Sequence, residues 1–198
     1  MDTARDTYHH GDLRTALIDA ALEMLEAGES FSLRAVARRA GVSQTAPYRH
    51  FADREALESA LAVRGFEDLN HELSPSGELP ASEAELIEFA IAYVHFALRR
   101  PALFRLMFGQ ECDDRNDARV LASGELQQLL RSSLEKIYPD ADGEVLPQAV
   151  WALAHGLAFL HLDGKLSAGS DDEVAARVRA AFLGIRALGG SALSERAQ

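Results

Sequence analysis

The chain is poor in several residue types, and each shortage excludes a class of protein. A single cysteine, Cys112, among 198 residues leaves no partner for an internal disulfide and excludes a cysteine-based zinc site. β-Branched residues are scarce, with 9 Val, 5 Ile and 4 Thr against 34 Ala and 28 Leu. Because alanine and leucine favour helices and β-branched residues favour strands, this composition predicts an all-α fold.

The sequence also predicts no signal for export or membrane insertion. Residues 1–6 are polar and no apolar stretch follows them, so we expect no signal peptide. We expect no apolar run that approaches the roughly 18–20 residues of a membrane span. The expectation is therefore a cytoplasmic protein with no membrane partner.

Positive charge is scarce overall but concentrated in one segment. The chain has 20 Lys and Arg against 31 Asp and Glu, a net charge of −11. Residues 30–54 hold five arginines against one carboxylate, Asp53, so their balance is +4 and the remainder carries −15. Such a basic island indicates a nucleic-acid-binding surface. An arginine-rich solvated helix face would have the same composition, so charge alone does not decide between them.

Apolar residues recur at three- and four-residue spacing along almost the whole chain, which predicts about nine helices. The expected helices span residues 13–27, 33–40, 44–50, 53–73, 82–98, 102–108, 118–138, 145–162 and 172–188. The clearest break is Ser74–Pro80, which contains two prolines and one glycine. We therefore expect an N-terminal domain over residues 8–70 and a C-terminal domain over residues 71–198.

Two short helices joined by one glycine carry the most information. Leu33, Val36, Ala37 and Ala40 fall on one helix face, and Gly41 can take the left-handed backbone of a tight turn. Helices this short persist only where tertiary packing holds them. The pair therefore predicts a helix-turn-helix, which presents its second helix to the major groove of DNA. An ordinary αα-hairpin with an arginine-rich face is the structural alternative.

The expected second helix carries side chains suited to DNA contacts. Gln44 and Thr45 stand at its N-terminal end, where glutamine can bond adenine and threonine can offer a hydroxyl or methyl group to a base. Groups suited to phosphates follow at Tyr48, Arg49, His50 and Arg54. Pro47 lies near the first turn, where its missing N–H costs less than in a helix interior.

The segments Phe31–Ser43, Tyr48–Phe51 and Arg54–Leu57 resemble the N-terminal domain of the TetR family. This resemblance implies a one-component regulator that dimerises through its C-terminal helices, binds a palindromic operator and is usually released by a small molecule. It places the following residues at DNA-contacting positions: Ser32, Arg34, Ser43, Gln44, Thr45, Pro47, Tyr48, His50 and Arg54. Arg54 stands at a position where lysine is the most common residue of the family. Residues Thr45–Pro47 differ from the most common family sequence, so the resemblance does not indicate which bases this chain prefers.

Three further segments, Tyr8–Arg14, Pro101–Gly109 and Trp151–Leu157, resemble the TetR subgroup named for a Trp-His-Gly signature. In the last of these, Trp151 and His155 are four residues apart and share a helix face. Aromatic residues at helical spacing around one imidazole predict a pocket for a small apolar or aromatic effector. The expected pocket residues are Phe89, Tyr93, Phe96, Phe104, Phe108, Trp151, His155 and Phe159. A plain core with a satisfied histidine is the alternative.

The last two expected helices carry matching apolar stripes. By the family resemblance they form the homodimer interface, with the residues Leu153, Leu157, Leu160, His161, Val178, Phe182 and Ile185. Packing within one chain is the alternative.

The sequence features favour a ligand-responsive repressor, and two other functions are alternatives to it. A metal-responsive regulator of the same fold would use His95, His155 and His161, but these lack a recognised ligand spacing. An enzyme would need a nucleophile elbow, a phosphate loop or paired carboxylates, and the sequence has none of these motifs. We expect no catalytic residues, no metal and no cofactor beyond the effector.

Overall fold

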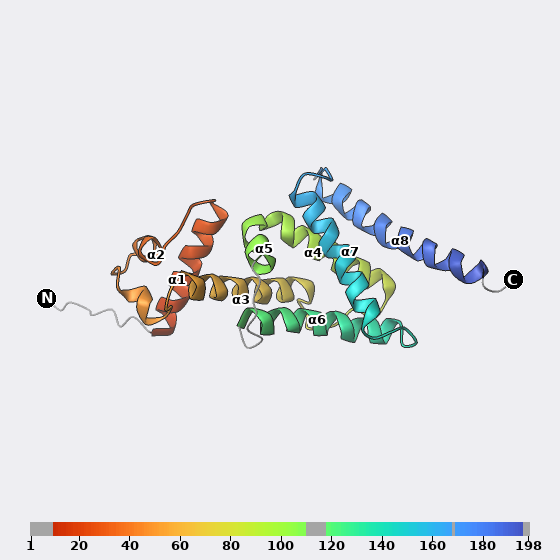
Figure 1. The fold of residues 1–198 in the computed structure, drawn as a ribbon, viewed down its shortest axis with the longest axis horizontal. Helices are drawn as coiled ribbons and strands as arrows, with labels where there is room; N and C mark the ends of the chain where they lie inside the picture. The colour runs from red at the N-terminus through yellow and green to blue at the C-terminus, as the bar shows by residue number, and fades with distance from the viewer. Residues whose placement is uncertain (1–9, 110–117, 168, 196–198) are drawn as a thin grey trace. The chain divides into compact units, whose positions relative to one another are not determined.

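The computed structural model describes residues 10–109, 118–167 and 169–195, with residues 10–12 and 186–195 described by their backbone alone. All regular structure in these ranges is helical, with eight α-helices and one short 3₁₀ helix. In chain order they are α1 (His10–Glu26), α2 (Leu33–Arg39), η1 (Ala46–Arg49), α3 (Arg54–Leu73), α4 (Glu83–Arg99), α5 (Pro101–Phe108), α6 (Ala118–Ile137), α7 (Val145–Leu162) and α8 (Asp171–Glu195) (Figure 1). The predicted all-α fold is confirmed.

Side-chain caps define the starts of two helices, α2 and α3. Ser32 Oγ accepts a hydrogen bond from the Ala35 N–H at 3.2 Å at the start of α2. Asp53 Oδ1 accepts from the Ala56 N–H at 2.9 Å at the start of α3. Such caps satisfy backbone donors that have no partner inside the helix.

Two elements differ from their predicted extents. The expected helix over residues 44–50 is only the 3₁₀ turn η1, because Pro47 disfavours the α conformation at the residue before it and Thr45 makes no side-chain cap. Helix α8 runs past Gly189 and Gly190 to Glu195. Glycine permits a helix end without forcing one, and the residues after this pair tolerate helical backbone.

The chain divides into two compact units, described separately. Unit 1 comprises Met1–Phe66 and Ala102–Ala122, and unit 2 comprises Glu67–Pro101 and Ser123–Gln198. This grouping places most of α5 and the start of α6 with the N-terminal helices. The boundary between an N-terminal domain over residues 8–70 and a C-terminal domain over residues 71–198 stays a prediction.

Unit 1 is held by a core that joins α3 to α5. Phe66 meets Phe108 edge-on at 5.2 Å between ring centroids, and Phe104 lies 4.8 Å from Phe108. A Cβ at Gly65 would lie 2.6 Å from Met107 Sδ, so glycine allows the two helices to approach closely. Phe104 is fully buried in this core.

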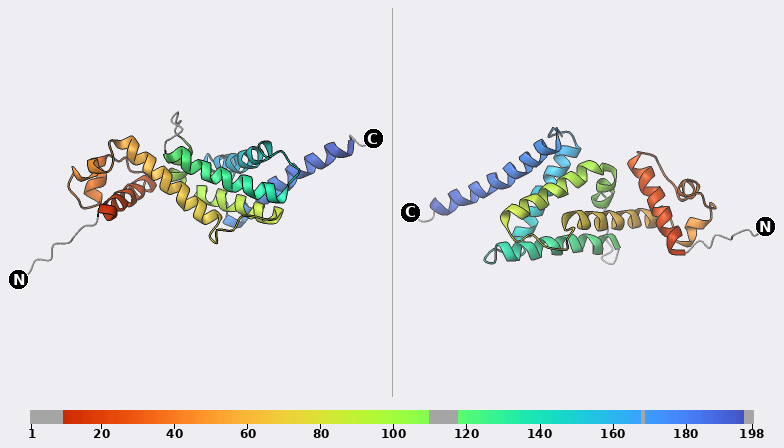
Figure 2. Two further views of the ribbon diagram at one scale, coloured as in Figure 1. Left: turned by 90° about the horizontal axis from the view of Figure 1, so that it is seen from below. Right: turned by 180° about the vertical axis from the view of Figure 1, so that it is seen from behind.

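Unit 2 is built around α4, which packs against both α7 and α8 (Figure 2). Its buried face is long and apolar, and Phe96 and Val94 are completely excluded from solvent. A second cluster of Leu86, Leu130 and Leu134 joins α4 to α6, and Trp151 of α7 packs against it. The C-terminal half of α6 is thereby fixed to α4 and α7.

Helix α7 corrects one expectation from the sequence. Its 18 residues, Val145–Leu162, contain no Asp, Glu, Lys or Arg and are long and apolar enough to cross a membrane by length and composition. One such helix is weak support for a membrane protein, because a core helix of a globular domain passes the same test. In unit 2 this helix packs on α4 and α8.

Candidate functional site

The turn after α2 has the geometry that a helix-turn-helix requires. Gly41 has φ +71°, in the left-handed region, while a Cβ built there would meet nothing within 4 Å. The Val42 N–H bonds to the Ala37 carbonyl at 2.9 Å and the Gly41 N–H to the Arg38 carbonyl at 3.2 Å. These are the paired bonds of a Schellman motif. Glycine is needed at this turn for its backbone conformation and not for space.

The segment after this turn holds the expected base-reading residues at the surface. Ser43, Gln44 and Thr45 are exposed and precede η1, with Ser43 Oγ and Thr45 Oγ1 hydrogen-bonded at 3.3 Å. Tyr48 is 51% exposed, which is unusual for a residue with so large an apolar ring. Pro47 is buried and anchors the turn, accepting at its carbonyl from the N–H groups of His50 and Phe51.

The structure separates the arginines of the basic island into two groups. Arg39 donates to both carboxylate oxygens of Glu29, at 2.9 and 2.8 Å, and is thereby neutralised. Arg34, Arg38 and Arg49 are exposed and form no ion pair with any residue that the structure describes. These three carry the uncompensated positive charge of this surface.

Arg54 is held partly by its own chain. Its Nε donates to Glu58 Oε1 at 2.7 Å, and its guanidinium lies 5.2 Å from the ring centre of Phe31. The side chain is still 60% exposed. Its Nη groups can meet a phosphate while Nε stays with Glu58, because the guanidinium carries five N–H donors.

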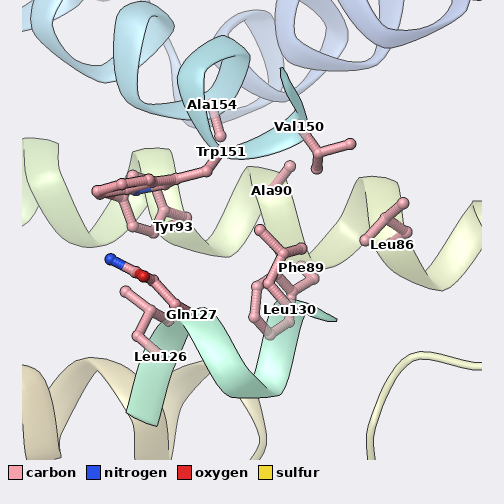
Figure 3. Close-up of a pocket in the computed structure, with 10 residues that line it drawn as sticks. All are labelled: Leu86, Phe89, Ala90, Tyr93, Leu126, Gln127, Leu130, Val150, Trp151 and Ala154. Atoms are coloured by element: carbon pink, nitrogen blue, oxygen red, sulfur yellow. The ribbon is translucent and has the colours of Figure 1, made fainter. Parts of the chain in front are cut away.

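A second site is an apolar cavity in unit 2, enclosed by α4, α6 and α7 (Figure 3). Its volume is about 30 Å³. The lining residues are Leu86, Phe89, Ala90, Tyr93, Leu126, Gln127, Leu130, Val150, Trp151 and Ala154. Tyr93 and Trp151 lie together at one end with the amide of Gln127 beside them, and Leu86 lies at the other end (Figure 3). Among these residues Gln127 supplies the only amide side chain, and none is ionised at neutral pH.

The polar atoms of the aromatic end are bonded to one another. Trp151 Nε1 donates to the Tyr93 hydroxyl at 3.4 Å, and that hydroxyl lies 2.8 Å from His155 Nδ1. Burial raises the pKa of Tyr93 far above its ordinary value, and burial lowers the pKa of His155. Nδ1 of a neutral His155 can therefore accept a hydrogen bond from the Tyr93 hydroxyl, which leaves Tyr93 and Trp151 facing the cavity mainly through their rings.

Three of the eight expected pocket residues line this cavity: Phe89, Tyr93 and Trp151. His155 and Phe159 lie behind them, with their rings 4.8 Å apart. Phe96 is fully buried elsewhere in unit 2. Phe104 and Phe108 lie in the core of unit 1, where the Phe108 ring packs against Phe66 and Phe104, and their assignment to the effector pocket stays a prediction.

The sequence reasoning missed the α6 side of the cavity. Leu126 and Leu130 are one turn apart and Gln127 lies beside them on the same helix. Their four-residue spacing was visible as a helix stripe. The spacing does not indicate which helices pack against this stripe, which are α4 and α7 in the structure.

The expected dimer residues divide between core and surface. Leu157, His161 and Val178 are buried within unit 2 of the single chain, and their place in a dimer interface stays a prediction. Leu153 and Phe182 are half-buried, while Leu160 and Ile185 are 44% and 52% exposed. An exposed face of α7 continues from Leu160 through Gly156 and Ala152 to Ala149.

The other residues considered for function give no metal site in the described part of the chain. No three His, Cys, Asp or Glu residues gather there in a way that could hold a metal ion. His155 is bonded to Tyr93, and His95 Nε2 lies 3.2 Å from the Asp171 carbonyl. Tyr8, His9 and Cys112 lie outside the described residues.

Two sequence families match this chain. The family described as "Bacterial regulatory proteins, tetR family" matches residues 17–61, and "Tetracyclin repressor-like, C-terminal domain" matches residues 86–183. An "Uncharacterized HTH-type transcriptional regulator" of Haemophilus influenzae is 28% identical over 128 residues. That match covers 63% of this chain and 62% of the relative's length.

The similarity to solved structures covers most of the chain. A protein of unknown function from Rhodococcus sp. RHA1 is 33% identical, with a TM-score of 0.76, over 91% of this chain and 98% of that one. A TetR/AcrR-family regulator from Thermobifida fusca is 19% identical, with a TM-score of 0.60, over 86% of this chain and 97% of that one. The Trp-His-Gly subgroup stays a prediction. The helix-turn-helix geometry and the matches to both halves agree: the chain belongs to the TetR family of DNA-binding transcriptional regulators.

Proposed function

We propose that this protein is a ligand-responsive repressor that binds a pseudo-palindromic operator as a homodimer in the cytoplasm. The observation that carries the DNA-binding part is the exposed segment Ser43–Thr45 beside three arginines that have no ion-pair partner in the described chain. Unpaired arginines attract phosphates without first breaking an internal salt bridge. The net charge of −11 keeps other surfaces from competing for DNA.

The dimer is supported by the exposed face of α7 and α8. Leu160, Leu183 and Ile185 expose 42–52% of their surface on these helices. Gly156 lies inside α7, and a Cβ there would meet nothing within 4 Å of its own chain. Glycine in a helix interior costs about 0.5–1 kcal/mol relative to alanine, so its presence at an open position favours close approach by a second chain.

The effector is proposed to be a small, largely apolar molecule bound at the cavity of Phe89, Tyr93 and Trp151. Apolar lining with few polar groups is typical of ligand sites. Such a ligand releases the operator only if it binds the DNA-free conformation more tightly, typically by about 1–3 kcal/mol.

The first test is the symmetry of the operator. Selection from random duplexes with the full-length protein is expected to return inverted repeats, with half-sites about 34–36 Å apart or somewhat more, because two recognition elements face successive major grooves. Single, unrepeated sites would contradict dimeric binding.

The second test separates base reading from phosphate binding. Gln44→Ala and Thr45→Ala are expected to change the preferred base, each by about 1–3 kcal/mol in discrimination. Tyr48→Phe, His50→Ala and Arg54→Ala are expected to weaken binding to all sequences alike, and Arg54→Ala, which removes a positive charge, is also expected to reduce the slope of affinity against salt. Fluorescence anisotropy on the selected duplex and its single-base variants, at several salt concentrations, measures both effects. Arg39→Ala is the matched control, since Glu29 already neutralises Arg39. If the variants of Tyr48, His50 and Arg54 change the preferred base and those of Gln44 and Thr45 do not, the roles of base reading and phosphate binding are reversed.

A further inference from the structure

The apolar cavity is too small, as it stands, for the ligand that its lining suggests. Its volume of about 30 Å³ has room for roughly two water molecules. Sites for small molecules usually enclose about 300–1,000 Å³. A ligand can bind there only if a lining side chain moves and opens further space.

A larger space lies next to the cavity in unit 2. A groove of about 350 Å³ runs between the end of α3, the loop 74–80 and one face of α4. Its apolar floor includes Leu73, Leu79 and Ala92. The groove is within the volume range of ligand sites, whereas the cavity alone is not.

One side chain borders both spaces. Phe89 is the residue that the linings of the cavity and the groove share, and it is only 9% exposed. It projects from α4 toward Leu130 of α6 in the direction of the cavity (Figure 3). No other residue belongs to both linings, so Phe89 is the side chain whose movement can connect the cavity to the groove.

We propose that Phe89 is the gate of the effector site, and that its displacement joins cavity and groove into one space for an uncharged, apolar ligand. This inference rests on the proposed function, since it concerns the same effector. The ligand enters from the groove beside loop 74–80 and passes the Phe89 ring to reach Trp151.

The charges around the two linings determine the ligand class. The cavity lining contains no positively charged group, so an anion placed there would lose its hydration without gaining a partner. The groove lining holds Glu78, Glu85 and Glu88, and no lysine or arginine. Glu88 is paired with Arg179 at 2.5 Å, which leaves the carboxylates of Glu78 and Glu85 to repel an anion. Anionic ligands are therefore excluded at the entrance and again inside.

A pair of fluorescent probes tests both parts of this proposal. N-Phenyl-1-naphthylamine is uncharged, and 8-anilinonaphthalene-1-sulfonate has the same aromatic body with a sulfonate added. Trp151 is the only tryptophan of the chain and lines the cavity, so energy transfer from Trp151 reports a probe bound in the cavity or the adjoining groove, and the substitutions below separate the two. The uncharged probe is expected to bind the full-length protein with energy transfer, and the sulfonate at least about tenfold more weakly.

Substitutions on each side of the gate complete the test. Phe89→Ala is expected to raise the association rate of the uncharged probe by about tenfold or more, because a gate open in at most about 10% of molecules limits entry in the parent. Ala92→Phe fills the groove without touching the cavity lining and is expected to slow association by a similar factor. Ala84→Phe is the matched control, because Ala84 is exposed on the same helix and lines neither space.

The outcomes distinguish this inference from the proposed function. Parent-like association in both Phe89→Ala and Ala92→Phe overturns the gate, as does the absence of energy transfer in the parent. Equal binding of the two probes overturns the ligand class. The control Ala84→Phe is also tested on the selected operator without probe, where parent-like affinity is expected. A parent protein that binds no DNA refutes the proposed function and leaves the probe measurements to decide the gate independently.

Discussion

Trp151→Ala is expected to lower the free energy of unfolding by about 3 kcal/mol, near the lower end for removal of a buried tryptophan. The indole packs against the cluster of Leu86, Leu130 and Leu134 and donates a hydrogen bond to the Tyr93 hydroxyl. Because part of the ring remains accessible, the loss does not reach the upper end of the range. Urea unfolding followed by circular dichroism measures the change.

Trp151→Phe serves as the control for this variant. It retains most of the ring packing and removes the indole N–H, so the expected loss is about 1 kcal/mol, the usual net contribution of one hydrogen bond. At temperatures where both variants are folded, both should bind operator, and Trp151→Ala should lose the response to the uncharged ligand. A Trp151→Ala protein that melts early yet responds like the parent would place Trp151 in the core and not in the pocket.

Leu160→Glu is expected to split the homodimer and to reduce operator affinity by about 10²–10⁴-fold. A two-fold interface is built from the same patch of both chains, so this substitution places two carboxylates in the interface, where each loses water without gaining a positive partner. Two linked half-site contacts gain that factor over a single contact, and a monomer loses it. Sedimentation velocity measures the dimer, and anisotropy on the selected duplex measures the affinity.

Leu121→Glu is the matched control for charge and exposure. Leu121 is 59% exposed on α6, so the same substitution adds the same charge at an exposed leucine that is not part of the proposed interface. It is expected to leave both the dimer and the operator affinity unchanged. A Leu160→Glu protein that remains dimeric would remove the exposed face of α7 from the interface.

Local signals were enough to predict most helix boundaries. The predicted extent of the α7 helix, Val145–Leu162, is the observed one, and Ser32 and Asp53, residue types that favour the N-cap, cap α2 and α3. Caps and apolar periodicity act within one or two helical turns, so they can be recognised in the sequence itself. Two local signals failed: Pro47 disfavours the α conformation at the residue before it, and the glycines at 189 and 190 did not end α8.

The sites were predicted less completely, because they depend on which helix packs against which. Phe89 and Phe104 have the same side chain and lie on similarly apolar helices, yet one borders the cavity and the other lies in the core of a different unit. Leu126 and Gln127 reach the cavity from α6, more than thirty residues away from Tyr93 along the chain. Helical periodicity tells which face is apolar, and only tertiary packing determines its partner.

The composition of α7 also affects how the protein is made. During synthesis this helix leaves the ribosome after α4, against which it packs, and before α8, which covers another part of it. Until α8 follows, 18 residues without a single Asp, Glu, Lys or Arg are only partly covered. Exposed apolar surface of this kind promotes aggregation and engages chaperones. The rate at which the last quarter of the chain is translated therefore influences how much protein reaches its native state.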